Sequence, residues 1–453
     1  GGAVRGSNLF HSFTEFNIND GQRVFFSNPS GIQNILTRVT GGQASNILGT
    51  LGVDGAANLF LINPNGILFG ENAQLNIQGS FLGTTANSLV FPNGIFSATN
   101  PSLPPLLTIN VPIGLQFGVQ PKPIISQGNQ LGIANNTLAL IGGEITLDGS
   151  FLFAIDGQVQ LGAVGENTTV GLQVNNSSLG FSLPDNATRA PITLTNGAFV
   201  GTSGDSTVKL VGGQIGVDNS STIFGLNGGS ISIDATGLSL NDGSRILTRT
   251  LLPTKVGDIQ IQARDAVTLA NSSIYSETSD AATGNGGNIS INVAQLGLNN
   301  SLLRTFTQGA ANAGNIQIQA KDAVTVNKSS IVSESIGATE GSSGDVSIAA
   351  GNITVIGDGG DFTSDIATFT SSQGNAGKLT LDAIDINVTK GGFVTVGTGG
   401  AGNTGDLIVR AINSVNVTDN GYLALSALNS GSTGNLQIET GTFKIENTNG
   451  IGA

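Results

Sequence analysis

Short segments in which aliphatic and polar residues alternate recur through the second half of the chain. Each segment opens on a glycine, and branched aliphatic residues occupy the second and fourth positions after it. The glycines are Gly229, Gly257, Gly287, Gly314, Gly344, Gly377, Gly405 and Gly434. The aliphatic residues are Ile231, Ile233, Ile259, Ile261, Ile289, Ile291, Ile316, Ile318, Val346, Ile348, Leu379, Leu381, Leu407, Val409, Leu436 and Ile438. The residue between each pair is polar in seven of the eight segments, which predicts a strand with one buried face.

The segments repeat at a spacing of 27 to 33 residues, and most hold further short apolar runs. Val267 with Leu269 marks one such run, and Ile274 marks the next. Three short strands per repeat, with no room for a helix of about ten residues, predict one coil of a parallel β-helix, a single-stranded solenoid. A β-propeller blade needs about 40 residues and four antiparallel strands, and a leucine-rich repeat is shorter. The predicted fold class is therefore all-β.

The first half of the chain is less regular. Sixteen of the 21 Phe residues lie at or before Phe224, and six of the 12 Pro residues lie within residues 101–123. Because Pro cannot donate a ladder hydrogen bond, the Pro-rich run predicts an excursion from the coil stack near residues 98–125. We place a boundary within one continuous helix, between irregular coils at 1–225 and regular repeats at 226–453.

The amino-terminal run "NLFHSFTEFNIND" places Phe10, Phe13 and Phe16 three residues apart. This spacing predicts a short helical turn that packs Phe side chains onto the first coil. Such a turn would seal an otherwise open strand edge, so we interpret it as an amino-terminal cap.

A rigid turn separates two apolar runs in "LFLINPNGILFG". Asn63 suits the first position of a type I β-turn, Pro64 presets φ at the second, Asn65 tolerates the third, and Gly66 suits the fourth. A near copy, "NPSG", occupies residues 28–31. We expect these turns to fix the register of the early coils.

Composition excludes several classes of function. Only 10% of residues are charged, the net charge is −13, and there is no basic run, so binding to nucleic acid or anionic lipid is disfavoured. No apolar stretch reaches the roughly 18 residues that a membrane span requires. Cys is absent, which excludes disulfides, thiolate nucleophiles and Cys-based metal sites.

The main alternative is a secreted polysaccharide lyase or hydrolase, because such enzymes also use β-helices. Hydrolases need clustered carboxylates, and lyases need an acidic Ca²⁺ site with a basic residue. No two acidic residues are adjacent in this sequence, and the sole His, His11, lies in the aromatic cap. We therefore predict no catalytic residues, no cofactor, no metal site and no enzymatic activity.

The remaining polar candidates also have simple structural interpretations. The densest acidic run holds Asp358, Asp361 and Asp365, without the spacing of a calcium β-roll, and a solvated loop is favoured. Asn-x-Ser/Thr sequences occur at Asn167, Asn271, Asn327, Asn387 and Asn416. We expect these Asn residues to stack as polar ladders rather than to accept glycans. Tyr275 and Tyr422 lie too far apart for an obvious sugar-stacking platform.

Several runs together resemble the amino-terminal secretion domain of filamentous haemagglutinin-like exoproteins of two-partner secretion systems. They are "NLFHSFTEFNI", "NPSGI", "ILTRVTGG", "GTLGVDGAANLFLINPNGILFG", "NVPIGLQFG" and "LALIGGEITLDGS". The resemblance is close over residues 1–165, and the later repeats resemble the β-helical stalk of such proteins. The family's secretion motifs correspond to Asn28, Pro29, Ser30 and Gly31, and to Asn63, Pro64, Asn65, Gly66 and Ile67. The motif at residues 28–31, with the sequence NPSG, departs from the family's NPNL form.

The resemblance implies a right-handed parallel β-helix exported through an outer-membrane β-barrel transporter with periplasmic POTRA-type domains. It implies a secreted or cell-surface protein of a Gram-negative-type bacterium, with the amino-terminal part as the secretion and folding-nucleation module. The later repeats would form an adhesin-like rod or stalk, with a surface carbohydrate or a host receptor as a further partner. We expect a monomer without membrane insertion. The two turns fit either folding of the early coils or direct contact with the transporter.

The chain contains no Met and opens on "GGAVRGSNLF", which we interpret as a processed or trimmed product. It ends on "ENTNGIGA" without an evident cap, which is consistent with truncation.

Overall fold

The computed structural model describes residues 2–102, 110–175, 178–279, 282–337, 340–359, 364–448 and 451–452. Every helix or strand assigned within these ranges is a strand. No helix there is long and apolar enough to cross a bilayer. The chain divides into two compact units, Gly1–Thr222 (unit 1) and Ile223–Ala453 (unit 2).

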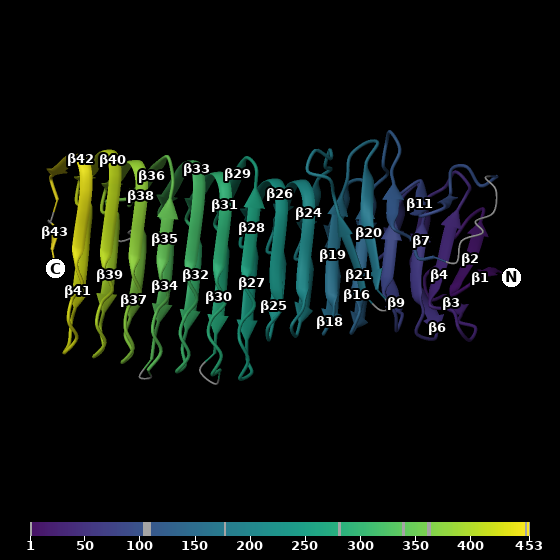
Figure 1. Ribbon diagram of the computed structural model, residues 1–453, viewed down its shortest axis with the longest axis horizontal. Helices are drawn as coiled ribbons and strands as arrows, with labels where there is room; N and C mark the ends of the chain where they lie inside the picture. Colours follow the sequence, from purple (N-terminus) through teal and green to yellow (C-terminus); the bar gives the residue numbers. More distant parts are fainter. Residues whose placement is uncertain are drawn as a thin grey trace. The chain divides into compact units, whose positions relative to one another are not determined.

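In unit 1 the chain winds through three series of strands, which Figure 1 shows in purple to blue-green. The first series is β2 (Asn8–Phe13), β4 (Asn34–Val39), β7 (Asn58–Ile62), β10 (Phe81–Thr84), β16 (Thr137–Gly142), β19 (Gln158–Ala163) and β24 (Thr207–Val217). The second is β5 (Ser45–Ile47), β8 (Ile67–Phe69), β14 (Ile124–Ser126), β17 (Ile145–Asp148) and β22 (Ile192–Thr195). The third is β3 (Arg23–Ser27), β6 (Thr50–Asp54), β9 (Gln74–Asn76), β15 (Leu131–Ala134), β18 (Phe151–Ile155) and β23 (Phe199–Ser203).

Successive strands of each series pair in parallel, coil upon coil. Between β9 and β15 the pairing is reduced to one bridge, from Gln74 to Gln130. Parallel stacking of three strand positions per coil is the arrangement of a β-helix. The parallel β-helix predicted from the sequence is therefore confirmed in unit 1.

A five-stranded antiparallel sheet interrupts these coils. Its strands are β11 (Ser88–Phe91), β12 (Gly94–Ser97), β13 (Gly114–Gln116), β20 (Thr169–Asn175) and β21 (Ser178–Ser182). They belong to two insertions, one after β10 and one after β19. Residues 103–109 of the Pro-rich run lie outside the described residues. The second insertion carries few Pro residues, so the sequence pattern did not signal it.

The antiparallel sheet creates a second hydrophobic core on the outside of the first strand series. Outward side chains such as Leu36 and Phe60 join one cluster with Phe91, Phe96 and Phe181 of the inserted strands. Every residue of β7 is consequently buried. Burial on both faces explains why the sequence of β7 is a nearly continuous apolar run rather than an alternating one.

Unit 2 repeats one coil with little variation (Figure 1, teal to yellow). The first and second series are joined into one long strand in most of its coils. Their strands are β26 (Ser230–Asn241), β28 (Ile259–Ala263), β29 (Ala266–Ala270), β31 (Ile289–Asn299), β33 (Ile316–Asn327), β35 (Val346–Ala349), β36 (Asn352–Ile356), β38 (Leu379–Thr389), β40 (Leu407–Thr418) and β42 (Leu436–Glu446). The third-series strands are β27 (Arg245–Thr250), β30 (Ser273–Thr278), β32 (Leu302–Thr307), β34 (Ser330–Ser335), β37 (Asp365–Thr370), β39 (Phe393–Thr398), β41 (Tyr422–Ala427) and β43 (Ile451–Gly452). The remaining strand, β25 (Thr222–Leu226), begins at the last residue of unit 1.

The sixteen aliphatic residues predicted to stack form two continuous columns in unit 2. One column starts with Ile231 over Ile259 and ends with Leu436, and the other starts with Ile233 over Ile261. Fourteen of the sixteen are at most 1% exposed, and the two half-buried ones belong to the last strand, β42. The prediction of inward aliphatic columns is confirmed.

The repeat glycines stand where neighbouring coils approach most closely. A Cβ atom on Gly287 would overlap the carbonyl oxygen of Gly257, and one on Gly314 would overlap that of Gly287. Neither glycine has a positive φ, so the requirement is for space rather than for an unusual backbone conformation. Side chains brace the same corner, because the hydroxyls of Thr305 and Ser333 donate to the carbonyl of Gly314 at 2.6 and 3.0 Å.

Replacing Gly287 with alanine is expected to destabilise unit 2 by about 1–3 kcal/mol, because the added methyl group forces the coils apart. Gly297 in β31 is the matched control, since no atom lies within 4 Å of a Cβ built there. Chemical denaturation of the two variants checks this. Equal losses in both would show that the close approach does not explain the glycine.

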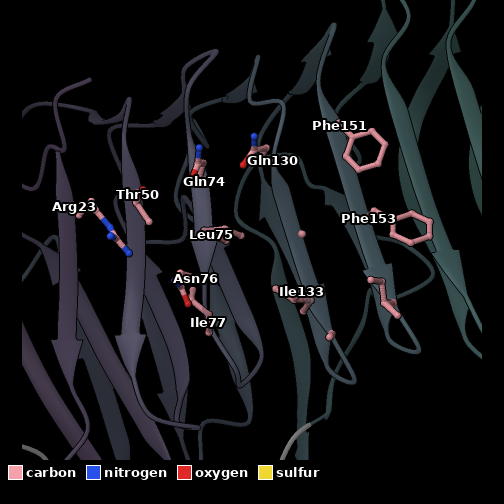
Figure 2. A pocket seen from close by; sticks show the side chains of 13 residues that line it. Arg23, Thr50, Gln74, Leu75, Asn76, Ile77, Gln130, Ile133, Phe151 and Phe153 are labelled. Atoms are coloured by element: carbon pink, nitrogen blue, oxygen red, sulfur yellow. The ribbon is translucent and has the colours of Figure 1, made fainter. Parts of the chain in front are cut away.

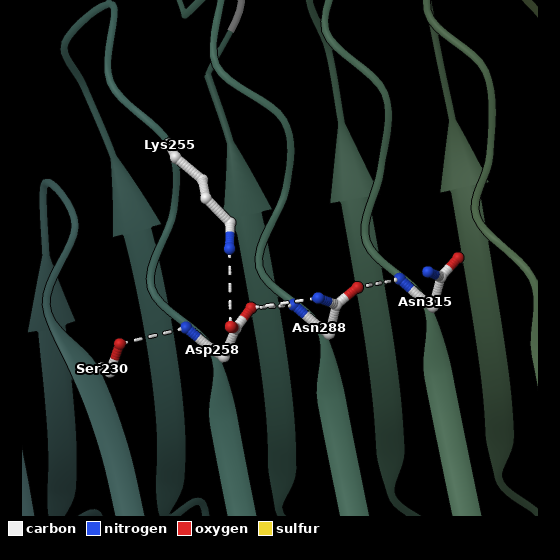
Figure 3. Close-up of polar contacts among 5 residues, drawn as sticks. All are labelled: Ser230, Lys255, Asp258, Asn288 and Asn315. Carbon is white, nitrogen blue, oxygen red and sulfur yellow. Dashed lines mark hydrogen bonds and ion pairs between the residues drawn. The ribbon is translucent and has the colours of Figure 1, made fainter.

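Polar side chains beside the glycines form a ladder along one corner of unit 2 (Figure 3). Oδ1 of Asp258 accepts a hydrogen bond from the backbone N–H of Asn288 at 2.8 Å, and Oδ1 of Asn288 accepts one from Asn315 at 2.9 Å. Asp258 also pairs with Lys255 at 3.5 Å, an exposed contact that adds little stability. The ladder satisfies backbone donors that the turn would otherwise leave without partners.

The predicted helical cap is wrong in its secondary structure. Residues 8–13 form strand β2, and β1 (Ala3–Arg5) pairs with it antiparallel. Because successive side chains of a strand alternate between faces, Phe10 packs against Phe96 in the second core, with ring centroids 5.0 Å apart. Phe13 instead packs against Phe16 at 5.4 Å. The spacing of three therefore reflects two aromatic clusters and not one helical face.

Candidate functional site

The second Asn-Pro turn joins β7 to β8. The N–H of Gly66 donates to the carbonyl of Asn63 at 3.2 Å, so residues 63–66 form the β-turn whose positions the sequence predicts. Asn63 is fully buried, whereas Pro64 and Asn65 are half-buried. Ile67, which follows the turn, is buried in β8. This turn is therefore packed against neighbouring coils rather than exposed to solvent.

The side chains of this turn hold the corner of the preceding coil. Nδ2 of Asn63 donates to the carbonyl of Gln43 and to Oγ of Ser45, both at 3.0 Å. Oδ1 of Asn63 accepts from the N–H of Asn65 at 3.0 Å. Nδ2 of Asn65 in turn donates to the carbonyl of Gly41 at 2.7 Å. The two amides therefore connect one coil to the previous one by hydrogen bonds, and both polar atoms of the Asn63 side chain have partners.

The first Asn-Pro turn joins β3 to β4 and has a different register. The N–H of Ile32 donates to the carbonyl of Pro29 at 3.1 Å, so the turn spans residues 29–32, one residue later than its sequence suggests. Gly31 sits at the third position with φ of 84°, as type II turns require. Pro29, Ser30 and Gly31 are exposed. Asn28 precedes this turn instead of opening it.

Asn28 bonds forward to the next coil. In the amide orientation that gives both ends a partner, its nitrogen donates to the carbonyl of Ile32 in the same turn at 3.0 Å. Its oxygen then accepts from the N–H groups of Ala56 and Ala57 in the next coil, at 3.2 Å. Gly55 lies against the same side chain, with φ of 148°. The two motifs thus occupy different corners of the coil, one after a third-series strand and one after a first-series strand. Both use a buried or half-buried Asn amide to connect neighbouring coils.

Sequence reasoning missed a third set of Asn residues inside unit 1. Nδ2 of Asn34 donates to Oδ1 of Asn8 at 3.0 Å, and Nδ2 of Asn58 donates to Oδ1 of Asn34 at 2.9 Å. The backbone N–H of Ser80 donates to Oδ1 of Asn58 at 2.8 Å. All four residues are buried. The signal was present, because Asn opens the strands "NLF", "NIL" and "NLF" at 8, 34 and 58, about one coil apart.

His11 belongs to the aromatic cluster of the cap. Its ring stacks with Phe13, with centroids 6.0 Å apart and planes 13° apart, and lies 5.3 Å from Phe26. Burial lowers the pKa of His11, which favours the neutral ring that such packing requires. The contacts give His11 a packing role.

The acidic run does not form a described ion-binding cluster. Asp361 lies outside the described residues, and Asp358 is 4.0 Å from Lys328. Within the part of the chain that the structure describes, no three His, Cys, Asp or Glu side chains converge as metal ligands would. Asp365 instead lies in β37, where it accepts a hydrogen bond from the hydroxyl of Ser330.

Asp365 is expected to make stability depend on pH. Burial raises its pKa from the ordinary 3.8 to about 6, Ser330 offsets part of this, and Glu334 adds to it. Since the folded state binds the proton more tightly than the unfolded state, stability rises as pH falls from above 6 towards 4. Asp365→Asn should therefore stabilise the protein by about 2 kcal/mol at pH 8 and flatten this dependence. Denaturation at pH 8 and pH 4.5 checks it, with exposed Asp345→Asn as the charge-matched control.

The sequences Asn-x-Ser/Thr lie at turns and in polar ladders. The amide pairs are Asn300 with Asn271 (2.7 Å), Asn327 with Asn299 (3.1 Å) and Asn416 with Asn387 (2.9 Å). Asn167 has φ of 52°, a conformation that Asn tolerates in turns. The predicted stacking of Asn271, Asn327, Asn387 and Asn416 is confirmed. Tyr275 and Tyr422 lie in β30 and β41, with four strands of their series between them.

Comparisons with known proteins agree with the resemblance. Residues 1–217 match the model of the TPS secretion domain. A stretch of 79 residues is 35% identical to the heme/hemopexin-binding protein of Haemophilus influenzae, which is 17% of this chain and 8% of that protein. The HMW1 secretion domain of Haemophilus influenzae has a TM-score of 0.35 and 15% identity, covering 100% of this chain and 96% of that one. At those values the structural likeness carries no weight.

A β-helix that begins with a TPS secretion domain defines an exported class of protein. Residues 1–217 match the TPS secretion domain, the domain of two-partner-secreted exoproteins. The matched family model describes a secretion domain.

Proposed function

We propose that residues 1–225 act as the secretion and folding-nucleation module of an exoprotein that crosses the outer membrane through a β-barrel transporter. The TPS secretion domain over residues 1–217 supports export to the cell surface or the medium. Residues 226–453 then serve as a β-helical stalk or adhesive surface. The transporter's periplasmic POTRA-type domains are the proposed first partner.

The observation that carries the folding role is the burial of Asn63. A residue with no exposed surface and a full set of bonds to the preceding coil cannot touch a transporter once the coil is formed. Its contacts form only when the coil of β7–β9 docks on the coil of β4–β6. The motif therefore contributes to the folding of the early coils.

A physical route links this folding to export. An unfolded chain presents aliphatic strands that can add to a sheet edge of the periplasmic domains, with backbone pairing supplying the affinity. Outside the cell, each completed coil offers a template for the next, because a solenoid coil needs contact only with its neighbours. Folding then opposes return through the pore without consuming nucleotide.

A substitution in the exposed turn at residues 29–31 can distinguish a role in folding of the early coils from direct contact with the transporter. Ser30→Arg keeps the turn geometry, since Ser30 is exposed and its side chain makes no hydrogen bond in the described structure. We expect normal stability and normal secretion when the chain, supplied with an export signal, is co-expressed with its transporter. The amount of chain in the medium, with and without the transporter, measures this. Loss of secretion with unchanged stability would assign the turn to direct transporter contact, and transporter-independent release would overturn the proposed export route.

A further inference from the structure

A groove opens in unit 1 where the third strand series comes apart (Figure 2). Three residue pairs join β6 to β9 and four join β15 to β18, but only the bridge from Gln74 to Gln130 connects β9 towards β15. Beyond that bridge lies a groove of about 740 Å³. This volume is within the range of about 300–1,000 Å³ that ligand sites occupy.

One side of the groove is aromatic. Phe151 is 41% exposed, and its ring stacks on Phe199 of the next coil with centroids 4.9 Å apart and planes 10° apart. Phe199 covers one face of the Phe151 ring, while Phe151 and Phe153 line the groove (Figure 2). The stack holds the Phe151 ring in place. The groove therefore has a flat, rigid apolar surface at its edge.

Amides from β9 and from the residue before β15 line the rest of the groove. Gln74, Asn76 and Gln130 line it, and none of their side chains makes a hydrogen bond with a described residue. Each amide offers two N–H donors and a carbonyl acceptor. Gly132 leaves the floor low, since only the carbonyl oxygen of Phe153 lies within 4 Å of a Cβ built on it.

The charge of the groove differs from that of the chain. Arg23 is the only charged residue among the thirteen that line the groove, although the whole chain carries a net charge of −13. Because no acidic residue lines the groove, it does not repel an acidic ligand, and with one charged residue it can also accept a neutral ligand. The combination of a flat apolar face, free amides and one cation suits a ligand that has both C–H faces and many hydroxyl groups.

We propose that this groove binds an extended neutral or acidic glycan, with a sugar ring on Phe151 and hydroxyl groups on the amides of Gln74, Asn76 and Gln130. Arg23 lies at the far end, where it can pair with a carboxylate of an acidic sugar. The site is independent of the export route, because binding is a property of the folded chain. A protein ligand fits less well, since it would leave several of the amides unused.

The test uses purified full chain and three probes: chitohexaose, cellohexaose and a hyaluronan octasaccharide. Calorimetric titration should detect binding of at least one probe. Phe151→Ala is expected to weaken it about three- to tenfold, as loss of one aromatic contact does. Gly132→Leu should abolish it by filling the floor, and its φ does not require glycine. Gly297→Leu in unit 2, also in open space, should leave it unchanged.

Arg23→Gln distinguishes the two kinds of sugar, since it should weaken hyaluronan and leave the neutral probes unaffected. Circular dichroism confirms that each variant is folded. The proposal is overturned by absence of binding to all three probes at millimolar concentration, or by binding that both Phe151→Ala and Gly132→Leu leave intact. Selection of peptides at the groove from a displayed library, with no sugar binding, would assign the site to a protein partner instead.

Discussion

Replacing Asn63 with alanine is expected to destabilise the early coils of unit 1 by about 3–5 kcal/mol, because several buried polar groups lose their partners at once. The carbonyl of Gln43, the hydroxyl of Ser45 and the N–H of Asn65 all bond to this one amide. Secretion through the transporter should fall with the stability, since early folding is what retains the chain outside. Hydrogen exchange at residues 41–45 and the amount of extracellular chain measure the two effects.

Asn93 provides a matched control, because it follows Pro92 and precedes Gly94 in a similar Pro-Asn-Gly turn of the β11–β12 hairpin. Asn93 is exposed, and its side chain makes no hydrogen bond with a described residue. Asn93→Ala should therefore change neither exchange nor secretion. If Asn63→Ala behaves like Asn93→Ala, the locking of the two coils is not the role of the motif.

Replacing Ile291 with aspartate is expected to unfold several coils of unit 2. Ile291 is 1% exposed and stacks between Ile261 and Ile318, so the variant places an unpaired carboxylate inside the aliphatic column. Such a charge costs upwards of about 4 kcal/mol unless the site opens to water. Because each coil is stabilised by its neighbours, protection should also be lost in β28 and β33.

Hydrogen exchange with peptide resolution checks this second result. Asn292→Asp is the control, since Asn292 is the next residue in β31 and points outwards, exposed. It introduces the same charge and should leave exchange unchanged. Protection that is lost only in β31, with β28 and β33 intact, would contradict the coupling between coils.

The aliphatic columns of unit 2 could be predicted because the pattern is local and repeated. Aliphatic residues at every second position specify which face of each strand is buried, and a repeat period near 29 residues specifies which residues meet in adjacent coils. The sequence showed that each repeat starts with a glycine, but it did not show why glycine is required there. Only the structure shows that Gly287 faces the carbonyl of Gly257 across a gap too small for a side chain.

The cap shows where pattern reasoning failed. Phe10, Phe13 and Phe16 fit a helical spacing, and nothing local revealed that a second core would compete for Phe10. That core depends on strands inserted some 80 to 170 residues later, including β11 and β21. In the turns, likewise, the residue types were predictable, whereas the one-residue difference in register was not. Gly31 accepts a positive φ that shifts the turn to residues 29–32.

The spacing of aliphatic and polar residues was enough to predict coils of three short strands with inward aliphatic columns, because alternating burial along a strand depends on neighbouring residues. The sequence also carries motifs that resemble those of two-partner secretion domains, and residues 1–217 match that domain. Three features became visible only in the folded chain: which coils the Asn63 and Asn28 amides connect, how the inserted sheet buries the outer face of β7, and where β9 and β15 separate to form a groove. The physical reason is distance along the chain: these features arise from contacts between residues at least one coil apart, which no local pattern encodes.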